Sequence, residues 1–175
     1  DLNEISINCS FDNLHADYVL QFDSSCQSLV IRHCSFGNCH SSTTGGSLYL
    51  SKGIPLDINF VNFINSTSQQ KGGGAYCVAS SVNLQFGCFI DCSSTYSQGQ
   101  GSNVFHAGNF GTKTSGGEIY STECSIHFCP RTLSKQDQTF TFSDGITSFS
   151  FLNMSNNQPN RETLGLSLPI KSLEN

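Results

Sequence analysis

The chain has 175 residues, enough for one domain or for an array of small repeated units. Only 12% of the residues are charged, and the net charge of −5 comes from scattered carboxylates, which argues against a nucleic-acid-binding surface. No run approaches the roughly 18 apolar residues of a membrane-spanning helix. Fourteen phenylalanines and five tyrosines instead indicate an ordered interior.

Short stretches of alternating apolar and polar residues follow one another along the chain. They lie at 29–31, 56–60 and 82–86, and each leads to a phenylalanine a few positions later. Alternation over such short runs predicts half-buried strands. We find no stretch with the 3.6-residue period of a helix, so the expected fold is all-β.

The residues at the ends of these strands form a repeating column. Its members are Phe11, Phe36, Phe63, Phe89, Ile126 and Phe151. Successive members are separated by roughly 25–27 residues, except for one longer step between Phe89 and Ile126. Self-similarity at this period predicts stacked units, each of which buries its apolar face on a neighbour. The long step has room for a loop insertion, which we place at 108–117.

Two further columns keep the same register. Two residues after each anchor stand Asn13, Asn38, Asn65, Asp91, Phe128 and Asn153. We expect the amides to form an inward asparagine ladder at a sharp turn, bonded to the backbone of neighbouring coils. Glycines at 45–46 and 72–74 mark other corners where positive φ is needed, and Tyr49, Tyr76 and Phe105 follow the glycines as an aromatic column.

Short strands, a regular repeat period and the lack of helices predict a parallel β-helix across residues 1–175. Each unit is one coil, and successive coils stack about 4.8 Å apart, so like residues lie above like residues. An antiparallel β-sandwich is the main alternative, because it also has short strands and frequent turns. A sandwich, however, needs neither a fixed period nor aligned columns.

The nine cysteines fall mostly into columns beside the anchors. Two residues before an anchor stand Cys9, Cys34 and Cys124, and three residues after an anchor stand Cys39, Cys92 and Cys129. Cys88 directly precedes its anchor, and Cys26 and Cys77 lie outside these columns. We favour packing as small buried hydrophobes. Disulfides remain an alternative, although the count is odd and in-register neighbours project the same way. Metal binding is the third interpretation, but the cysteine spacings lack the CxxC pairs of structural zinc sites.

Residues suited to catalysis are sparse. Glycoside hydrolysis needs two facing carboxylates, whereas Asp12, Asp23, Asp57 and Asp91 occur about once per coil without a shared outward column. No nucleophile, metal or phosphate motif is present, so we predict no catalytic, cofactor-binding or metal-binding residue. Sequons make Asn8, Asn65 and Asn153 candidate glycosylation sites. A glycan would not fit at Asn65 or Asn153 if both lie in the inward ladder.

Several motifs resemble a known repeat. GGAY (73–76), with GGSLY (45–49) and GGEIY (116–120), is similar to a glycine-rich motif, and FGN (36–38), FIN (63–65), FIDC (89–92) and FLN (151–153) to a Phe–Asn turn motif. Together they resemble the polymorphic outer-membrane-protein (Pmp-like) repeat of chlamydial and trichomonad surface proteins. One residue separates Phe from Asn where the bacterial repeat has two, and a cysteine follows, which is closer to the trichomonad type. The resemblance implies a right-handed β-helix acting in adhesion at a cell surface, and it carries over no catalytic residues.

We therefore expect a right-handed, single-stranded parallel β-helix of the pectin-lyase-like type, with six coils or so, each of roughly 25–27 residues. Its expected role is that of a non-enzymatic structural and adhesive rod of a cell-surface or secreted protein, with no cofactor and an unspecified host or matrix ligand. One alternative is an internal scaffold or filament-associated β-helix with reduced cysteines. Another is a polysaccharide-binding or -cleaving β-helix. Both ends look interrupted, so we expect adjoining polypeptide of a longer chain, or a partner protein, to cover them.

Overall fold

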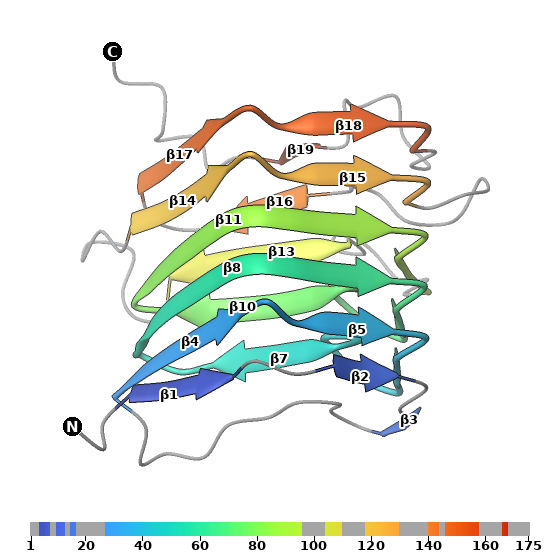
Figure 1. Ribbon diagram of the computed structural model, residues 1–175, viewed down its shortest axis with the longest axis horizontal. Helices are drawn as coiled ribbons and strands as arrows, with labels where there is room; N and C mark the ends of the chain where they lie inside the picture. Colours follow the sequence, from blue (N-terminus) through green and yellow to red (C-terminus); the bar gives the residue numbers. More distant parts are fainter. Residues whose placement is uncertain are drawn as a thin grey trace.

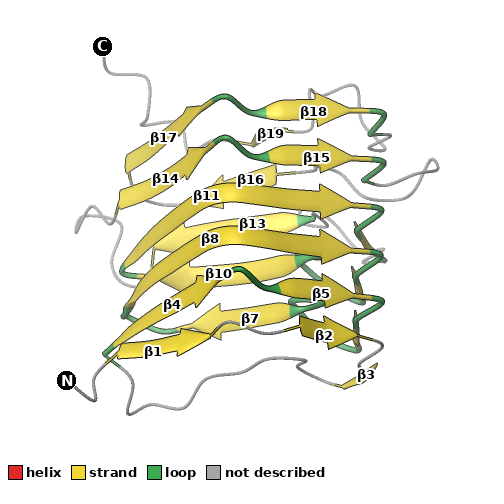
Figure 2. Ribbon diagram, in the orientation of Figure 1, coloured by secondary structure: helices red, strands yellow, loops and turns green. Residues whose placement is uncertain are grey.

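Every element described in the computed structural model is a β-strand (Figure 1, Figure 2). The structure describes residues 4–7, 10–12, 15–16, 27–95, 104–109, 118–129, 140–143, 146–157 and 166–167. All strand pairs are parallel, and they form a β-solenoid of about four turns, which confirms the all-β class and the parallel stacking. Within these residues no helix is long and apolar enough to cross a membrane.

The largest sheet has ten strands and bends partway along each coil. Its first part runs in the order β1 (Glu4–Ile7), β4 (Ser28–Arg32), β8 (Pro55–Ile64), β11 (Ser81–Ile90), β14 (Glu118–Thr122) and β17 (Ile146–Ser150). Beyond the bend lie β2 (Ser10–Asp12), β5 (Ser35–Gly37), β15 (Ser125–His127) and β18 (Asn153–Ser155), whereas β8 and β11 continue through it.

Two smaller sheets complete the described coils. The five-stranded sheet contains β7 (Leu48–Ser51), β10 (Ala75–Ala79), β13 (Phe105–Asn109), β16 (Phe140–Ser143) and β19 (Leu166–Ser167). The four-stranded sheet contains β3 (His15–Ala16), β6 (His40–Ser41), β9 (Thr67–Ser68) and β12 (Ser93–Ser94). The predicted insertion at 108–117 begins inside β13, at Gly108, and residues 110–117 lie outside the described part of the chain.

The inner column of anchors follows the strand register. Phe11 lies opposite Phe36, Phe36 opposite Phe63, Phe63 opposite Phe89, and Phe89 opposite Ile126. The rings of Phe36 and Phe63 stack at 5.2 Å, and those of Phe63 and Phe89 at 4.7 Å. These three side chains are fully buried, because parallel in-register pairing places like residues above one another inside the solenoid.

The last member of the predicted column is wrong. The residue opposite Ile126 is Met154, and Phe151 stands three positions earlier, at the bend, with 79% of its surface exposed. The bend residue always precedes the inward residue by three positions, as Phe60 precedes Phe63. The phenylalanine at the bend resembles the anchor in sequence, and the step from Ile126 to Met154 is longer than the predicted one.

Left-handed backbone marks two corners in each coil of the largest sheet between β4 and β18. The first corner is the bend, at His33, Phe60, Phe86, Glu123 and Phe151, and the second follows the anchor, at Asn38, Asn65, Asp91, Phe128 and Asn156. Their φ values lie between 49° and 54°, a region that asparagine and aspartate adopt more readily than other side chains. Asn153 is not at this corner, contrary to the prediction. It lies on β18 opposite Ser125.

The asparagine ladder faces outward rather than inward. Asn65 Nδ2 donates to Asn38 Oδ1 at 2.7 Å, and both side chains are exposed, because a left-handed corner turns them away from the core. Asn13 lies outside the described residues. Bonding from an amide to the preceding coil's backbone occurs at Asn157, whose Nδ2 donates to the Ile126 carbonyl and whose Oδ1 accepts from the Cys129 N–H.

The glycine corners follow the prediction. Gly45 and Gly72 have φ of 69° and 68°, which side chains rarely adopt. A Cβ at Gly46 would overlap the Gly73 carbonyl oxygen of the next coil. These glycines therefore let neighbouring coils approach to strand-pairing distance at the corner.

Candidate functional site

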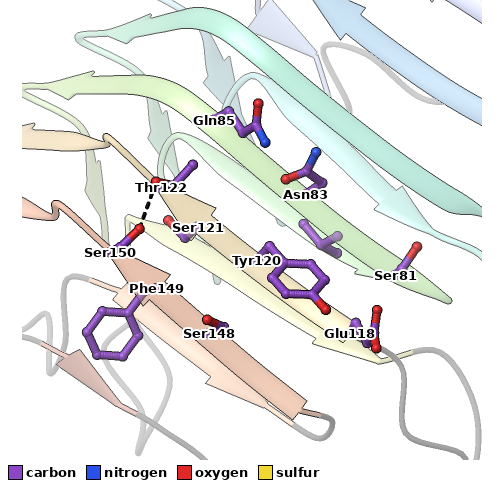
Figure 3. Close-up of a pocket in the computed structure, with 11 residues that line it drawn as sticks. Ser81, Asn83, Gln85, Glu118, Tyr120, Ser121, Thr122, Ser148, Phe149 and Ser150 are labelled. Atoms are coloured by element: carbon purple, nitrogen blue, oxygen red, sulfur yellow. Dashed lines mark hydrogen bonds between the residues drawn. The ribbon is translucent and has the colours of Figure 1, made fainter.

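A pocket of about 460 Å³ lies on the outer face of the largest sheet, over β11, β14 and β17 (Figure 3). Its lining residues come from three successive strands of that sheet. They are Ser81, Val82, Asn83, Gln85, Glu118, Tyr120, Ser121, Thr122, Ser148, Phe149 and Ser150. The volume lies within the range of small-molecule sites, roughly 300–1,000 Å³.

Strand alternation places the polar side chains of the pocket outward. Val82, Leu84 and Ile119 face the core and are at most 1% exposed, so the residues between them face solvent. The register then sets Asn83 opposite Tyr120 and Gln85 opposite Thr122. On the next strand, Tyr120 lies opposite Ser148 and Thr122 opposite Ser150, so the polar groups form rows across the strands.

Hydrogen bonds along these rows fix the two amides. Asn83 Nδ2 donates to Asp57 Oδ1 at 3.1 Å, and Gln85 Oε1 accepts from Asn59 Nδ2 at 3.3 Å. Among the described residues, no further partner is recorded for Asn83 Oδ1 or Gln85 Nε2. The pocket is therefore left with one oriented acceptor and one oriented donor.

Tyr120 provides the large ring of the pocket, and 44% of its surface is exposed. Its hydroxyl lies beside the Glu118 carboxylate, two residues earlier on the same face of β14 (Figure 3). The neighbouring Glu118 carboxylate raises the pKa of Tyr120, so the phenol stays neutral. At the other end of the pocket the hydroxyls of Thr122 and Ser150 are 2.8 Å apart.

On the strands that precede the pocket, the outer face carries an ion pair, and a stack of rings lies at the bend. Arg32 Nη2 lies 3.1 Å from Asp57 Oδ2, and the arginine side chain is half exposed, so the pair contributes little to stability. At the bend, the His33 and Phe60 rings stack at 5.1 Å and the Phe60 and Phe86 rings at 4.3 Å. Sequence reasoning missed this second aromatic column.

A third row of rings lies on the five-stranded sheet. Tyr49 stacks on Tyr76 at 5.6 Å, and Tyr76 stacks on His106 at 4.7 Å. The predicted third member, Phe105, is instead an inward residue opposite Ala75. His106 is 5% exposed, and burial, with a smaller contribution from Lys71, lowers its pKa to about 4.

The seven described cysteines are free, and all except Cys88 are buried. Burial raises the pKa of Cys77 and, together with the neighbouring Cys129 thiol, that of Cys92. Thiols in this state pack as small apolar groups and react slowly. Cys9 and Cys26 lie outside the described residues.

None of the residues predicted from the sequence lines the pocket. Among the predicted anchors, the core residues are Phe36, Phe63, Phe89 and Ile126, whereas Phe151 is exposed at the bend. The described asparagines of the turn column lie beyond the bend. Of the sequon residues, Asn8 is outside the described part, whereas Asn65 and Asn153 are exposed, so the predicted steric obstacle to a glycan there is wrong. Where residues are described, no group of three His, Cys, Asp or Glu side chains is placed to hold a metal ion.

No protein-family model, curated protein or solved structure matches this chain. The functional argument therefore rests on the side chains of the outer face.

Proposed function

We propose that this chain is a non-enzymatic structural and adhesive β-helix rod of a cell-surface or secreted protein. The observation that carries the proposal is the in-register stacking of coils, seen in the column Phe36, Phe63 and Phe89. Because each coil contacts only its neighbours, such a stack is a stiff spacer that presents the same outer positions repeatedly. Polar ladders and stacked rings on the largest sheet give this surface groups that can bind a partner.

The finer description of the rod belongs to the same proposal. It is a right-handed, pectin-lyase-like helix of about six coils, related to the trichomonad type of the Pmp-like repeat. The spacing of the anchors and the two left-handed corners per coil support it. A crystal structure that shows a left-handed solenoid, or fewer coils, would contradict this part.

Adhesion is tested with beads that carry the chain. The beads are counted on epithelial cells and on extracellular-matrix proteins, with beads that carry albumin as the control. The proposal expects retention on one of these surfaces well above the albumin beads. Equal counts on every surface would contradict the adhesive role.

An internal scaffold is the second candidate, and the buried free thiols favour it, because cytosolic proteins keep their cysteines reduced. The exposed sequon residue Asn153 gives a direct way to decide. Intact mass of the protein from its native source would show glycans if it is displayed outside the cell. Nine free thiols and no glycan would instead support the scaffold.

An adjoining solenoid segment is the partner we propose for the β17 side of the sheet. Within the sheet β17 pairs with β14, and Ile146 and Phe151 are 62% and 79% exposed (Figure 1). Apolar side chains at such an edge favour association with another β segment. Sedimentation should show less self-association after Ile146→Ser and Phe151→Ser. An unchanged profile would contradict the proposal.

A further inference from the structure

We propose that the pocket formed by β11, β14 and β17 binds a neutral oligosaccharide. This inference rests on the adhesive function proposed above and names the chemical class of the ligand. It is carried by the composition of the pocket, by the orientation of its amides and by the exposed ring of Tyr120.

The polar groups of the outward residues select the class of ligand. Most ligand pockets are lined by apolar side chains with few polar groups. Here the outward residues of three strands bear amides, hydroxyls, a phenol and a carboxylate, and they are Ser81, Asn83, Gln85, Glu118, Tyr120, Thr122, Ser148 and Ser150. A ligand that satisfies them must bear donors and acceptors along its whole length, as the hydroxyls of a sugar chain do.

Charge restricts the ligand further. Glu118 is the one ionisable carboxylate among the lining residues, and none of the lining residues is a lysine, arginine or histidine. Asp57, which accepts from Asn83, lies next to the pocket and already pairs with Arg32. An anionic sugar or a phosphate would therefore meet a negative site without a counter-charge, whereas a neutral chain would not.

The roles of individual groups follow from their positions. The exposed ring of Tyr120 offers an apolar face to the C–H groups of a pyranose. Asn83 Oδ1 and Gln85 Nε2, whose partner atoms fix their orientation, offer an acceptor and a donor on β11. Glu118, whose carboxylate lies beside the phenol, accepts from a sugar hydroxyl, and the Thr122–Ser150 hydroxyl pair closes the opposite side (Figure 3).

An extended peptide fits this surface less well. Peptides that add to a sheet bind at a free edge, whereas β11 and β14 are paired on both sides. Peptide recognition also uses apolar pockets for alternate side chains, whereas the outward residues that line this pocket are polar apart from the ring of Tyr120. Phe149 adds a second exposed ring from an inward position. The geometry therefore favours a polyhydroxylated chain lying across the strands.

Titration calorimetry of the chain with four tetrasaccharides tests the inference. The probes are cellotetraose, mannotetraose and N-acetylchitotetraose, which are neutral, and tetragalacturonate, which is anionic. The proposal expects one neutral probe to bind, with an affinity that changes little with salt. Tyr120→Ala should weaken binding about tenfold or more, and Gln85→Ala should weaken it less. Tyr49→Ala, on the five-stranded sheet, is the matched control and should leave the affinity unchanged.

Three results would overturn the inference: no binding of any neutral probe at millimolar concentration, equal binding of tetragalacturonate, or an affinity that both pocket variants leave unchanged. Circular dichroism verifies that each variant is folded. If Tyr120→Ala does not fold, the affinity of Gln85→Ala decides the test. The bead assay separates this inference from the proposed function. If Tyr120→Ala beads adhere as well as the parent beads, the adhesive role stands and the sugar site is wrong.

Discussion

Residues 28–90 and residues 118–157 share one register but differ in what they bury. In the first region the inward residues of β4, β8 and β11 before the bend are aliphatic and at most 2% exposed, namely Leu29, Ile31, Leu56, Ile58, Val82 and Leu84. In the second region the same positions hold Ile119, Ser121, Thr147 and Phe149. Thr147 Oγ1 is buried without a partner in the described structure, and Phe149 is 40% exposed.

The aromatic packing differs in the same direction. The three anchor phenylalanines of the first region stack face to face, whereas Phe140 meets Phe89 and Phe142 edge-on, at 89° and 82°. The anchor column also changes from phenylalanine to Ile126 and Met154. Backbone pairing and left-handed corners therefore keep the register, while side-chain packing sets how firmly each coil is held.

The largest expected effect comes from the stacked anchor. Phe63→Ala removes a fully buried ring with neighbours on both sides, so the free energy of unfolding should fall by about 3–5 kcal/mol. Met154→Ala is the matched change in the second region, where the side chain is half-buried, and it should cost roughly 1 kcal/mol. Urea unfolding of both variants measures the difference. Equal losses would contradict the comparison.

The second largest expected effect is a dependence of stability on pH that comes from His106. This residue lies on β13, which pairs with both β10 and β16. Its folded pKa of about 4 lies below the unfolded value of 6.5, so the unfolded state binds more protons between these pH values. Stability from this group is present above pH 6.5 and should be lost as pH falls toward 4, by about 3 kcal/mol. Urea unfolding across this range should show the loss. His106→Gln should remove this loss of stability with falling pH. If the variant keeps the same dependence of the free energy of unfolding on pH, the result would argue against burial of His106.

The turn column should respond in opposite directions in the two regions. Asn65→Ala places alanine in left-handed backbone and should cost about 1–2 kcal/mol, whereas Asn65→Gly should cost less. Phe128 occupies the equivalent corner of the second region at φ 53°, and Phe128→Asn should raise stability. Thermal melts of the three variants test this. If Phe128→Asn lowers the melting temperature, the contacts of the Phe128 ring stabilise the fold by more than its left-handed backbone destabilises it.

The smallest expected effect is a gain at Thr147. Thr147→Val replaces a buried hydroxyl that has no described partner with a methyl group at an inward position opposite Ile119. The variant should be more stable by about 1 kcal/mol, because the buried unsatisfied hydroxyl is removed. Val82→Thr, the reverse change in the first region, should be destabilising. A neutral result for Thr147→Val in urea unfolding would indicate that the hydroxyl has a partner.

The fold was predictable because its anchors repeat. The regular period of the anchors and the glycine corners are visible in sequence, and they led to the parallel stacking. The last coil was misaligned by three positions because Phe151 at the bend looks like the anchor and Met154 does not. The orientation of the asparagines was also mistaken, because sequence shows that a corner exists but not which way a left-handed residue turns its side chain.

The pocket was not predictable in the same way. Asn83 and Tyr120 face each other across β11 and β14, yet they are far apart in the sequence, and the long step between Phe89 and Ile126 hides their shared register. Serine, asparagine and glutamine at outward positions are also ordinary for a solvated strand. The usable signal was the alternation within 81–85 and 118–122, which marks the outward positions once the strands are aligned.

Amide hydrogen exchange followed by mass spectrometry tests the comparison most directly. It reports how firmly each strand is held, independently of any variant. The account predicts that peptides from β8 and β11 exchange slowest and that those from β17 and β18 exchange fastest within the largest sheet. Equal protection across the sheet, or slower exchange in β17 and β18, would contradict the claim that stacked anchors hold the first region more firmly than the second.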